Sequence, residues 1–340
     1  MTGAIGPQPT VPQPTVLHSR PGYEGANIRT WIGFKHFMYL AERAVLQWLS
    51  DRGTGPGALY LEHGLGAEIT DFSVQLPAVL EIDDEVRAEV TGAGPRLNVR
   101  LSVTRQGTPV TVLSGKVKLA LVRERTAGRH RPAPEPLAAL EAADLAAAST
   151  VTGRPAIPVP PGASPESVLA GSVPAGSAPA TDPAGFVWSW RAPYFYCHFS
   201  DRVQHSGFVR ALEEVVDRFL ADRGISVGRM LTERSWIPVV SRARVQLIGP
   251  AYMEETIHTV FAVTDILRGV MFDGRMDCYA ERDGELVPVA TATILHGYAI
   301  AAGEGAGGMA SLDPGVIAAL TGSKPAASEM TAGAVAGSGR

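Results

Sequence analysis

The chain has 340 residues, 45% of them hydrophobic, with five Trp, eight Tyr and ten Phe. This apolar content is enough for two domains of ordinary size and excludes a wholly disordered chain. A formal net charge of -4 excludes a global field that would attract nucleic acid or an anionic membrane.

Cysteine content and hydropathy give the expected compartment. Two cysteines, Cys197 and Cys278, cannot build a disulfide framework or a four-thiolate zinc site. The first residues lack the charged start and apolar run of a secretory signal, and no run approaches the ~20 apolar residues that span a bilayer. We therefore expect a soluble, cytoplasmic protein that uses neither a membrane nor nucleic acid as a partner.

Aromatic residues and proline divide the chain. Residues 1–23 are of low complexity, residues 125–185 combine abundant Pro and Ala with no Phe, Trp or Tyr, and residues 302–340 are rich in Gly and Ala. Such segments bury too little apolar surface by themselves to offset the entropy of ordering them. We predict a disordered N-terminal segment, a Pro/Ala-rich linker and a disordered tail, with folded domains at 24–124 and 186–301.

The first folded domain begins with a helix signal. Phe37, Leu40, Ala41, Ala44 and Trp48 form one apolar stripe at helical spacing. The helix should end at the Asp-Arg-Gly sequence 51–53, where Gly suits a left-handed cap. Several β-rich runs follow, and the last two are separated by the turn sequence Arg-Gln-Gly-Thr.

The second folded domain repeats this plan. Phe208, Leu212, Val215 and Phe219 give a helical stripe that ends at Asp-Arg-Gly 222–224, and β-rich runs follow. The two Asp-Arg-Gly sequences are 171 residues apart, as are two Val-Gln-Leu sequences. We infer an internal duplication. One helix with about five mostly antiparallel strands, present twice, predicts an α+β fold in which each sheet curls around its helix.

The start of the second helix carries the residues best suited to chemistry. A helix that begins near Gly207 offers unpaired backbone N–H groups to a ligand carbonyl, and Gly permits a close approach. Ser206 and Phe208 flank this position as further substrate-binding candidates, and His205 could position a hydrogen bond at the entrance. A polarised carbonyl at this place predicts an oxyanion-type site.

Three carboxylates could act on that carbonyl. Glu214, Asp201 and Glu213 are each candidates to activate water or to attack directly. The alternative interpretation is structural: Asp201 or Ser206 caps the helix, the two glutamates are solvated, and His205 is a packed histidine.

Residues 199–219, FSDRVQHSGFVRALEEVVDRF, resemble the helix entry of hotdog-fold acyl-thioesterases, the superfamily of 4-hydroxybenzoyl-CoA thioesterase. In one branch an acid lies nine positions after the His of a His-Gly-Gly motif, which implies Glu214. In another the acid lies before the helix, four residues ahead of the His or its equivalent, which implies Asp201. The resemblance implies two tandem hotdog domains, each a curled antiparallel sheet around one long helix, with the site formed between them.

The first domain departs from the motif. At the 171-residue offset, Phe34 takes the place of His205, Arg43 takes that of Glu214, and only Glu42 keeps a carboxylate. The resemblance therefore implies one competent site and one degenerate site, with the first domain serving as partner to the second.

The function implied is hydrolysis of an acyl thioester carried by CoA or by an acyl carrier protein, with no metal or redox cofactor. Two alternatives remain open, namely dehydration or isomerisation of a thioester-bound acyl chain and non-catalytic binding of acyl thioesters. A homo-oligomer of the tandem unit is compatible with the sequence.

Overall fold

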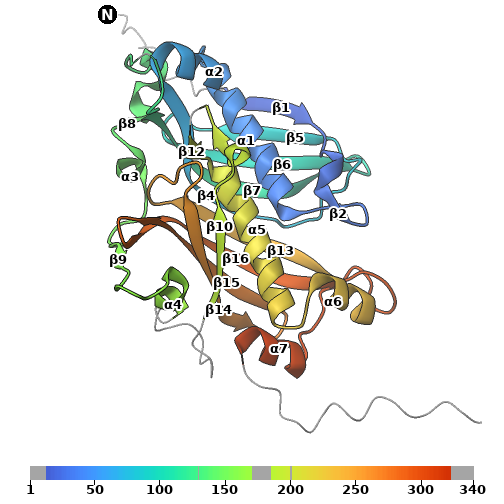
Figure 1. Cartoon of the computed structure of the whole chain (residues 1–340). Coiled ribbons are helices and arrows are strands. Elements are labelled where there is room, and N and C mark those ends of the chain that lie inside the picture. Colours follow the sequence, from blue (N-terminus) through green and yellow to red (C-terminus); the bar gives the residue numbers. More distant parts are fainter. Residues whose placement is uncertain (1–12, 129, 171–184, 200, 323–340) are drawn as a thin grey trace, which may run out of the picture.

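A computed structural model describes residues 13–128, 130–170, 185–199 and 201–322 (Figure 1). Its dominant feature is one antiparallel sheet, with two long helices side by side on one face. These helices are α1 (Phe34–Ser50) and α5 (His205–Asp222). The expected α+β plan is observed, as one continuous sheet.

The sheet consists of two halves with the same strand order. Across the first half the strands are β1 (Thr15–Ser19), β5 (Val86–Thr91), β6 (Arg96–Arg105), β7 (Thr108–Arg123) and β4 (Leu65–Gln75). Across the second half they are β13 (Trp236–Leu247), β16 (Glu285–Ile300), β15 (Met271–Arg282), β14 (Thr256–Leu267) and β10 (Phe186–Arg191). From its outer edge to the centre of the sheet, each half therefore has the same arrangement of strands.

The two halves join where β4 pairs with β13. Five antiparallel residue pairs connect these strands, from Arg242 opposite Gln75 to Gln246 opposite Asp71. Arg244 and Asp71 reinforce the junction with a two-pronged ion pair, whose distances are 2.9 Å from Nε to Oδ1 and 2.6 Å from Nη2 to Oδ2. The helices α1 and α5 also contact each other above this junction.

Smaller elements complete each half. Their bounds are β2 (Ala26–Ile28), β3 (Trp31–Ile32), α2 (Pro56–Ala58) and a π-helical turn (Leu59–His63) in the first, and β11 (Cys197–His198), β12 (Arg202–Val203) and α6 (Val227–Arg234) in the second, with short 3₁₀ turns at Tyr23–Gly25 and Tyr194–Tyr196. The β2–β3 and β11–β12 pairs lead directly into α1 and α5. They fix how each long helix begins.

The long helices, the glycines that follow them and the hairpin turns are formed as the sequence predicts. Both apolar stripes are buried against the sheet, and both helices are followed by a left-handed glycine, Gly53 with φ +92° and Gly224 with φ +73°. The turns between β6 and β7 and between β15 and β16 hold two successive residues at positive φ. That is the type I′ geometry that suits a two-residue hairpin.

The joining segment has more structure than its composition indicates. Residues 135–170 form a 3₁₀ turn (Glu135–Leu140), β8 (Glu141–Ala142), α3 (Leu145–Ala148), β9 (Ile157–Pro158) and α4 (Pro165–Ala170). β8 adds to β7 and β9 adds to β16. Leu169 packs with Val260 and Tyr279, whose chain neighbours Phe261 and Cys278 point into the helix-covered core. The part of the segment around α4 therefore covers the opposite face of the sheet, whereas Leu137, Leu140 and Leu145 belong to the main core cluster.

Both chain ends contribute to the fold as well. Thr15–Ser19, within the segment expected to be disordered, forms β1 on the edge of the sheet. In the tail, α7 (Pro314–Thr321) buries Val316 and Leu320, so the predicted disorder of 302–340 does not hold for residues 302–322. Residues 1–12, 171–184 and 323–340 lie outside the described part of the chain.

Candidate active site

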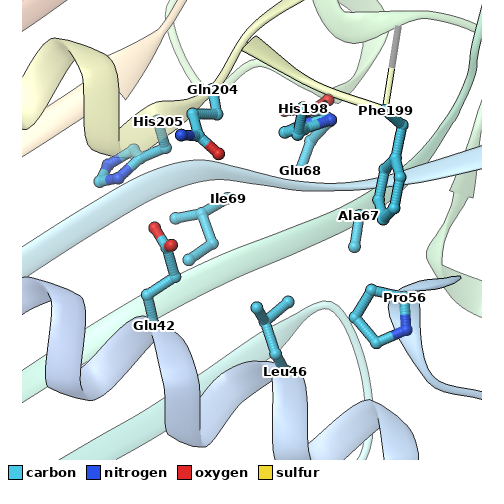
Figure 2. Close-up of a pocket in the computed structure, with 10 residues that line it drawn as sticks. All are labelled: Glu42, Leu46, Pro56, Ala67, Glu68, Ile69, His198, Phe199, Gln204 and His205. Carbon is cyan, nitrogen blue, oxygen red and sulfur yellow. Dashed lines mark ion pairs between the residues drawn. The ribbon is translucent and has the colours of Figure 1, made fainter. Parts of the chain in front are cut away.

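A pocket of about 140 Å³ lies between the middle of α1, the beginning of β4 and the entry to α5 (Figure 2). Both halves of the chain contribute to its wall, whose residues are Glu42, Leu46, Pro56, Ala67, Glu68, Ile69, His198, Phe199, Gln204 and His205. Apolar side chains form one part of the lining, and two carboxylates, an amide and two imidazoles form the other. Such a mixture suits a small apolar group with a polar reacting centre.

Glu42 is the carboxylate of the first half that points from α1 toward the start of α5 (Figure 2). Burial raises the pKa of Glu42 to about 7 from its ordinary value of 4.5; the charge of His198 lowers it and that of Glu68 adds to the rise. Within the described part of the chain, no hydrogen bond or ion pair holds its carboxylate. A carboxyl group that titrates near neutral pH in a cleft is well placed to accept a proton.

The entry to α5 supplies Gln204 and His205. Gln204 is the N-cap residue, and its side chain makes no capping hydrogen bond, so the amide is left to the pocket. His205 is 3% exposed, and burial lowers its pKa to about 4, so the imidazole is neutral at pH 7. Its Nε2 lies 3.4 Å from the carbonyl oxygen of Val245, and we assign the proton to that nitrogen. In the described part of the chain the N–H groups of His205 and Ser206 have no backbone partner, whereas that of Gly207 donates to the carbonyl oxygen of Gln204.

A buried ion cluster stands beside the pocket and comprises Arg202, Glu68 and Glu124, hereafter the Arg202 cluster. Nε of Arg202 donates to Oε1 of Glu68 at 2.7 Å, and Nη2 donates to Oε1 of Glu124 at 2.5 Å. All three residues are at most 3% exposed. At Gly66 an added Cβ would lie 2.0 Å from Oε1 of Glu124, so only glycine lets this strand pass the cluster.

His198 connects this cluster to the pocket. Its Nε2 lies 3.0 Å from Oε1 of Glu68 and its Nδ1 lies 3.8 Å from Oε1 of Glu124; the ring is not aligned for a hydrogen bond, so these are ion-pair contacts. Burial lowers the pKa of His198, but the two carboxylates outweigh this effect and raise the pKa above its ordinary value. The atoms of Glu68, Glu124 and His198 are close enough together to ligate one cation. Arg202 already supplies positive charge between the carboxylates.

The three carboxylates predicted from the sequence lie outside the pocket lining. Glu214 accepts from Nη2 of Arg218 at 2.7 Å, and that guanidinium stacks on Trp188. Asp201 pairs with Arg125. Glu213 pairs with Lys35 at the start of α1. Of the predicted catalytic residues, the structure brings only His205 to the pocket.

The predicted carbonyl-binding residues are buried at the helix entry. Ser206, Gly207 and Phe208 are all buried, and none of them lines the pocket. A Cβ on Gly207 would lie 3.1 Å from Val203 and 3.2 Å from Tyr196. This glycine therefore permits close packing of the helix on the β11–β12 segment.

Sequence reasoning missed Glu68, Glu124, His198 and Gln204, and it considered Glu42 only as a remnant of a degenerate site. One available signal was Glu68, a charged residue in the otherwise apolar run at the start of β4. The 171-residue offset offered another, because Glu42 corresponds to Glu213. Since α1 and α5 pass each other, each of these glutamates lies at the start of the opposite helix.

Comparison with known proteins addresses the fold. No protein-family model matches the sequence, and a search of curated proteins finds no match. Among solved structures, the 12:0-ACP thioesterase of Umbellularia californica matches 84% of this chain and 94% of its own, with a TM-score of 0.56 and 10% identity. The fold is that of the hotdog thioesterases.

Two further hotdog structures match over a similar extent. A protein described as an oleoyl thioesterase from Lactobacillus plantarum aligns with 85% of this chain and 97% of its own, with a TM-score of 0.54 and 12% identity. An acyl-ACP thioesterase from Bacteroides thetaiotaomicron covers 83% and 97%, with a TM-score of 0.50 and 9% identity. These matches extend over both halves of the sheet. In the described part of the chain, no helix is both long and apolar enough to cross a bilayer.

Proposed function

We propose that the protein is an acyl-thioester hydrolase composed of two tandem hotdog domains, with Glu42 as the carboxylate of its one complete site. The observation that carries the proposal is the pocket, where an unpaired glutamate of high pKa faces the start of a helix from the other domain. The solved structures of similar fold, named as thioesterases, support the same class of reaction.

The thioester carbonyl would sit at the entry to α5. There the N–H groups of His205 and Ser206 and the amide of Gln204 can donate to the oxygen as it becomes an oxyanion. Glu42 takes a proton from water, whose oxygen bonds to the carbonyl carbon; the carbon–sulfur bond then breaks and the sulfur leaves as a thiolate. The neutral His205, tied to Val245, holds the helix entry in place.

The start of α1 differs from the start of α5 in the state of the carboxylate that it faces. Glu213 lies near Gly33, the residue at the start of α1 that corresponds to Gln204, but it is paired with Lys35. A carboxylate neutralised by an ammonium group is a poor base and leaves no room for substrate. This asymmetry supports one competent site, whose carboxylate is supplied by the first domain and whose carbonyl donors are supplied by the second.

Hydrolysis of acyl-CoA and acyl-pantetheine by four proteins tests the proposal. Glu42→Gln should lower turnover by roughly 10²–10⁴-fold. Glu214→Gln is the matched control, a glutamate on the equivalent helix that is 36% exposed, and it should retain turnover, as should Glu213→Gln. Full activity in Glu42→Gln would remove Glu42 from the mechanism.

Product analysis separates hydrolysis from the other chemistries of an acyl thioester. A free acid and a free thiol are expected from the wild type. An unsaturated or isomerised acyl chain that stays on its thiol would indicate a dehydratase or isomerase. Unchanged thioester that co-elutes with the protein would indicate a binding protein.

A further inference from the structure

The Arg202 cluster joins the two halves, with Glu68 and Glu124 from the first and Arg202 from the second, and among the described residues the place related to it by the duplication holds no such cluster. Equivalent positions are fixed by matching backbone hydrogen bonds: Glu124 donates to Gly64 as Ala301 donates to Ser235, and Val203 donates to Ala251 as Ile32 donates to Leu80. In this correspondence the three cluster positions are occupied by apolar residues at the equivalent place, Glu68 by Val239, Arg202 by Trp31 and Glu124 by Ala301.

These apolar counterparts also lie together. Ala301 belongs to a small buried cluster with Ile237 and Ala299, and both Trp31 and Val239 pack against it. The same location in the same fold is therefore filled by hydrophobic contact at one of the two equivalent places and by three charges at the other. The fold itself does not require the charges.

The cost of burying charged groups also indicates that the cluster is not there for stability. Removing ions from water costs several kcal/mol for each ion, and replacing a buried ion cluster by well-packed apolar residues is often neutral or stabilising. Oε2 of Glu68 is buried without a hydrogen-bond partner in the described part of the chain, so the cluster is not fully satisfied. Its position on the pocket wall, where Glu68 and His198 line the cavity, indicates a role in the site.

We propose that the Arg202 cluster is a positioning device that holds His198 as an imidazolium at the pocket wall, where its positive charge faces Glu42 and the thioester carbonyl. This inference rests on the proposed function for its catalytic consequence. The charge state of His198 does not depend on that function.

The charges around His198 account for this state. It is faced by Glu68 from β4, Glu124 just after β7, Arg202 from β12 and Glu42 from α1. Two buried carboxylates and one guanidinium leave a net charge of -1, which an imidazolium neutralises. The residue at the corresponding place in the other half is Asn27, which cannot carry charge.

A fixed imidazolium would serve the reaction in two ways. Its charge lowers the pKa of Glu42 against the effect of burial, so more of the carboxylate is available as a base at neutral pH. It also stabilises negative charge that develops on the substrate, within a site partly shielded from water. His198 would then act on the substrate, and the Arg202 cluster would act through His198.

The test exchanges the cluster for the residues that occupy the equivalent place. The variant Glu68→Val, Arg202→Trp, Glu124→Ala replaces all three charges together, which avoids leaving a single charge buried. His198→Asn is a second variant that leaves the cluster intact. The imidazole C2–H signal of His198, assigned by comparison with His198→Asn, is followed by NMR as a function of pH.

In the wild type, the midpoint of His198 should lie above 6.5, the ordinary value for histidine. In the triple variant it should fall below that value, because burial then acts without the carboxylates. Turnover should fall about 10-fold to 10²-fold in both variants, and the acid limb of the pH–rate profile should move to higher pH as Glu42 loses its cationic neighbour. Melting temperature should be unchanged or higher in the triple variant.

Two results would overturn the inference: a wild-type midpoint below 6.5, or a triple variant that keeps both the wild-type midpoint and the wild-type turnover. If the triple variant does not fold, the NMR titration midpoint of His198 in the wild type and the pH–rate profile of His198→Asn still test the inference. Because the NMR titration needs no substrate, a raised midpoint in a protein that hydrolyses no thioester would refute the proposed function and leave the positioning of His198 intact.

Discussion

Replacing Glu42 by Gln should make the protein more stable while it removes activity. Burial holds the pKa of Glu42 at about 7, above its ordinary 4.5, so folding favours the protonated acid. The stability contributed by that acid is complete below pH 4.5 and is lost as the pH rises through 7. Glutamine has nearly the shape of the protonated acid and cannot ionise.

The size of the effect follows from the two pKa values. A difference of about 2.5 units, at roughly 1.4 kcal/mol for each unit, corresponds to about 3 kcal/mol. Glu42→Gln should therefore gain up to about 3 kcal/mol of unfolding free energy at pH 9 and close to nothing at pH 4. The same midpoint near 7 should appear in the pH dependence of kcat/KM, where activity rises as Glu42 loses its proton.

Thermal unfolding of wild type and variant from pH 4 to pH 9 measures this difference. The gap in Tm should widen with rising pH. Glu214→Gln is the control, because it loses only a surface pair with Arg218 worth about 0.3–0.5 kcal/mol. A gap that is independent of pH, or a variant less stable than the wild type at pH 9, would refute the reasoning about Glu42.

Two predictions concern packing. The pocket of about 140 Å³ is close to the size of a cavity that holds one benzene ring, so kcat/KM should be higher for butyryl or benzoyl thioesters than for lauroyl thioesters. Leu46→Ala should shift the optimum to longer chains. A wild type that prefers lauroyl thioesters, or a Leu46→Ala variant with the wild-type optimum, would contradict this. Leu320→Ala in α7 should cost about 2–4 kcal/mol of unfolding free energy, whereas Leu61→Ala, at 70% exposure, should cost almost none; equal Tm values for the two would show that α7 adds no stability.

The repeated plan was predictable from the sequence because its signals are local. The apolar stripe of α1, from Phe37 to Trp48, depends only on spacing along one helix. The glycines that follow the helices and the two-residue turns depend only on backbone conformation. A constant offset of 171 residues then shows that both halves share these signals.

The carboxylate of the pocket was harder to predict because it depends on contacts between the halves. Glu213 and Glu214 are adjacent in sequence, but one turns toward Lys35 and the other toward Arg218. Which glutamate reaches a helix start is decided by how α1 and α5 pass each other. Nothing in the spacing within one copy specifies that the entry to α5 faces Glu42.

Composition misled for the joining segment and the tail, because it describes what a segment can bury alone. Leu137 and Leu169 are fully buried, yet the surface that covers them belongs mostly to the sheet and not to their own segment. A short run with one or two leucines can be ordered when it docks on a surface that already exists.

The junction of β4 with β13 places both copies in one polypeptide, and this removes a restriction that symmetric assemblies obey. In a homodimer with twofold symmetry, each substitution appears at both equivalent places. A Lys35 that neutralised one carboxylate would there neutralise the other as well. Fusion allowed one helix start to close around Lys35 and Glu213 while its counterpart kept Glu42 unpaired. If the proposed function holds, the molecule contains its own inactive reference site in the same sheet.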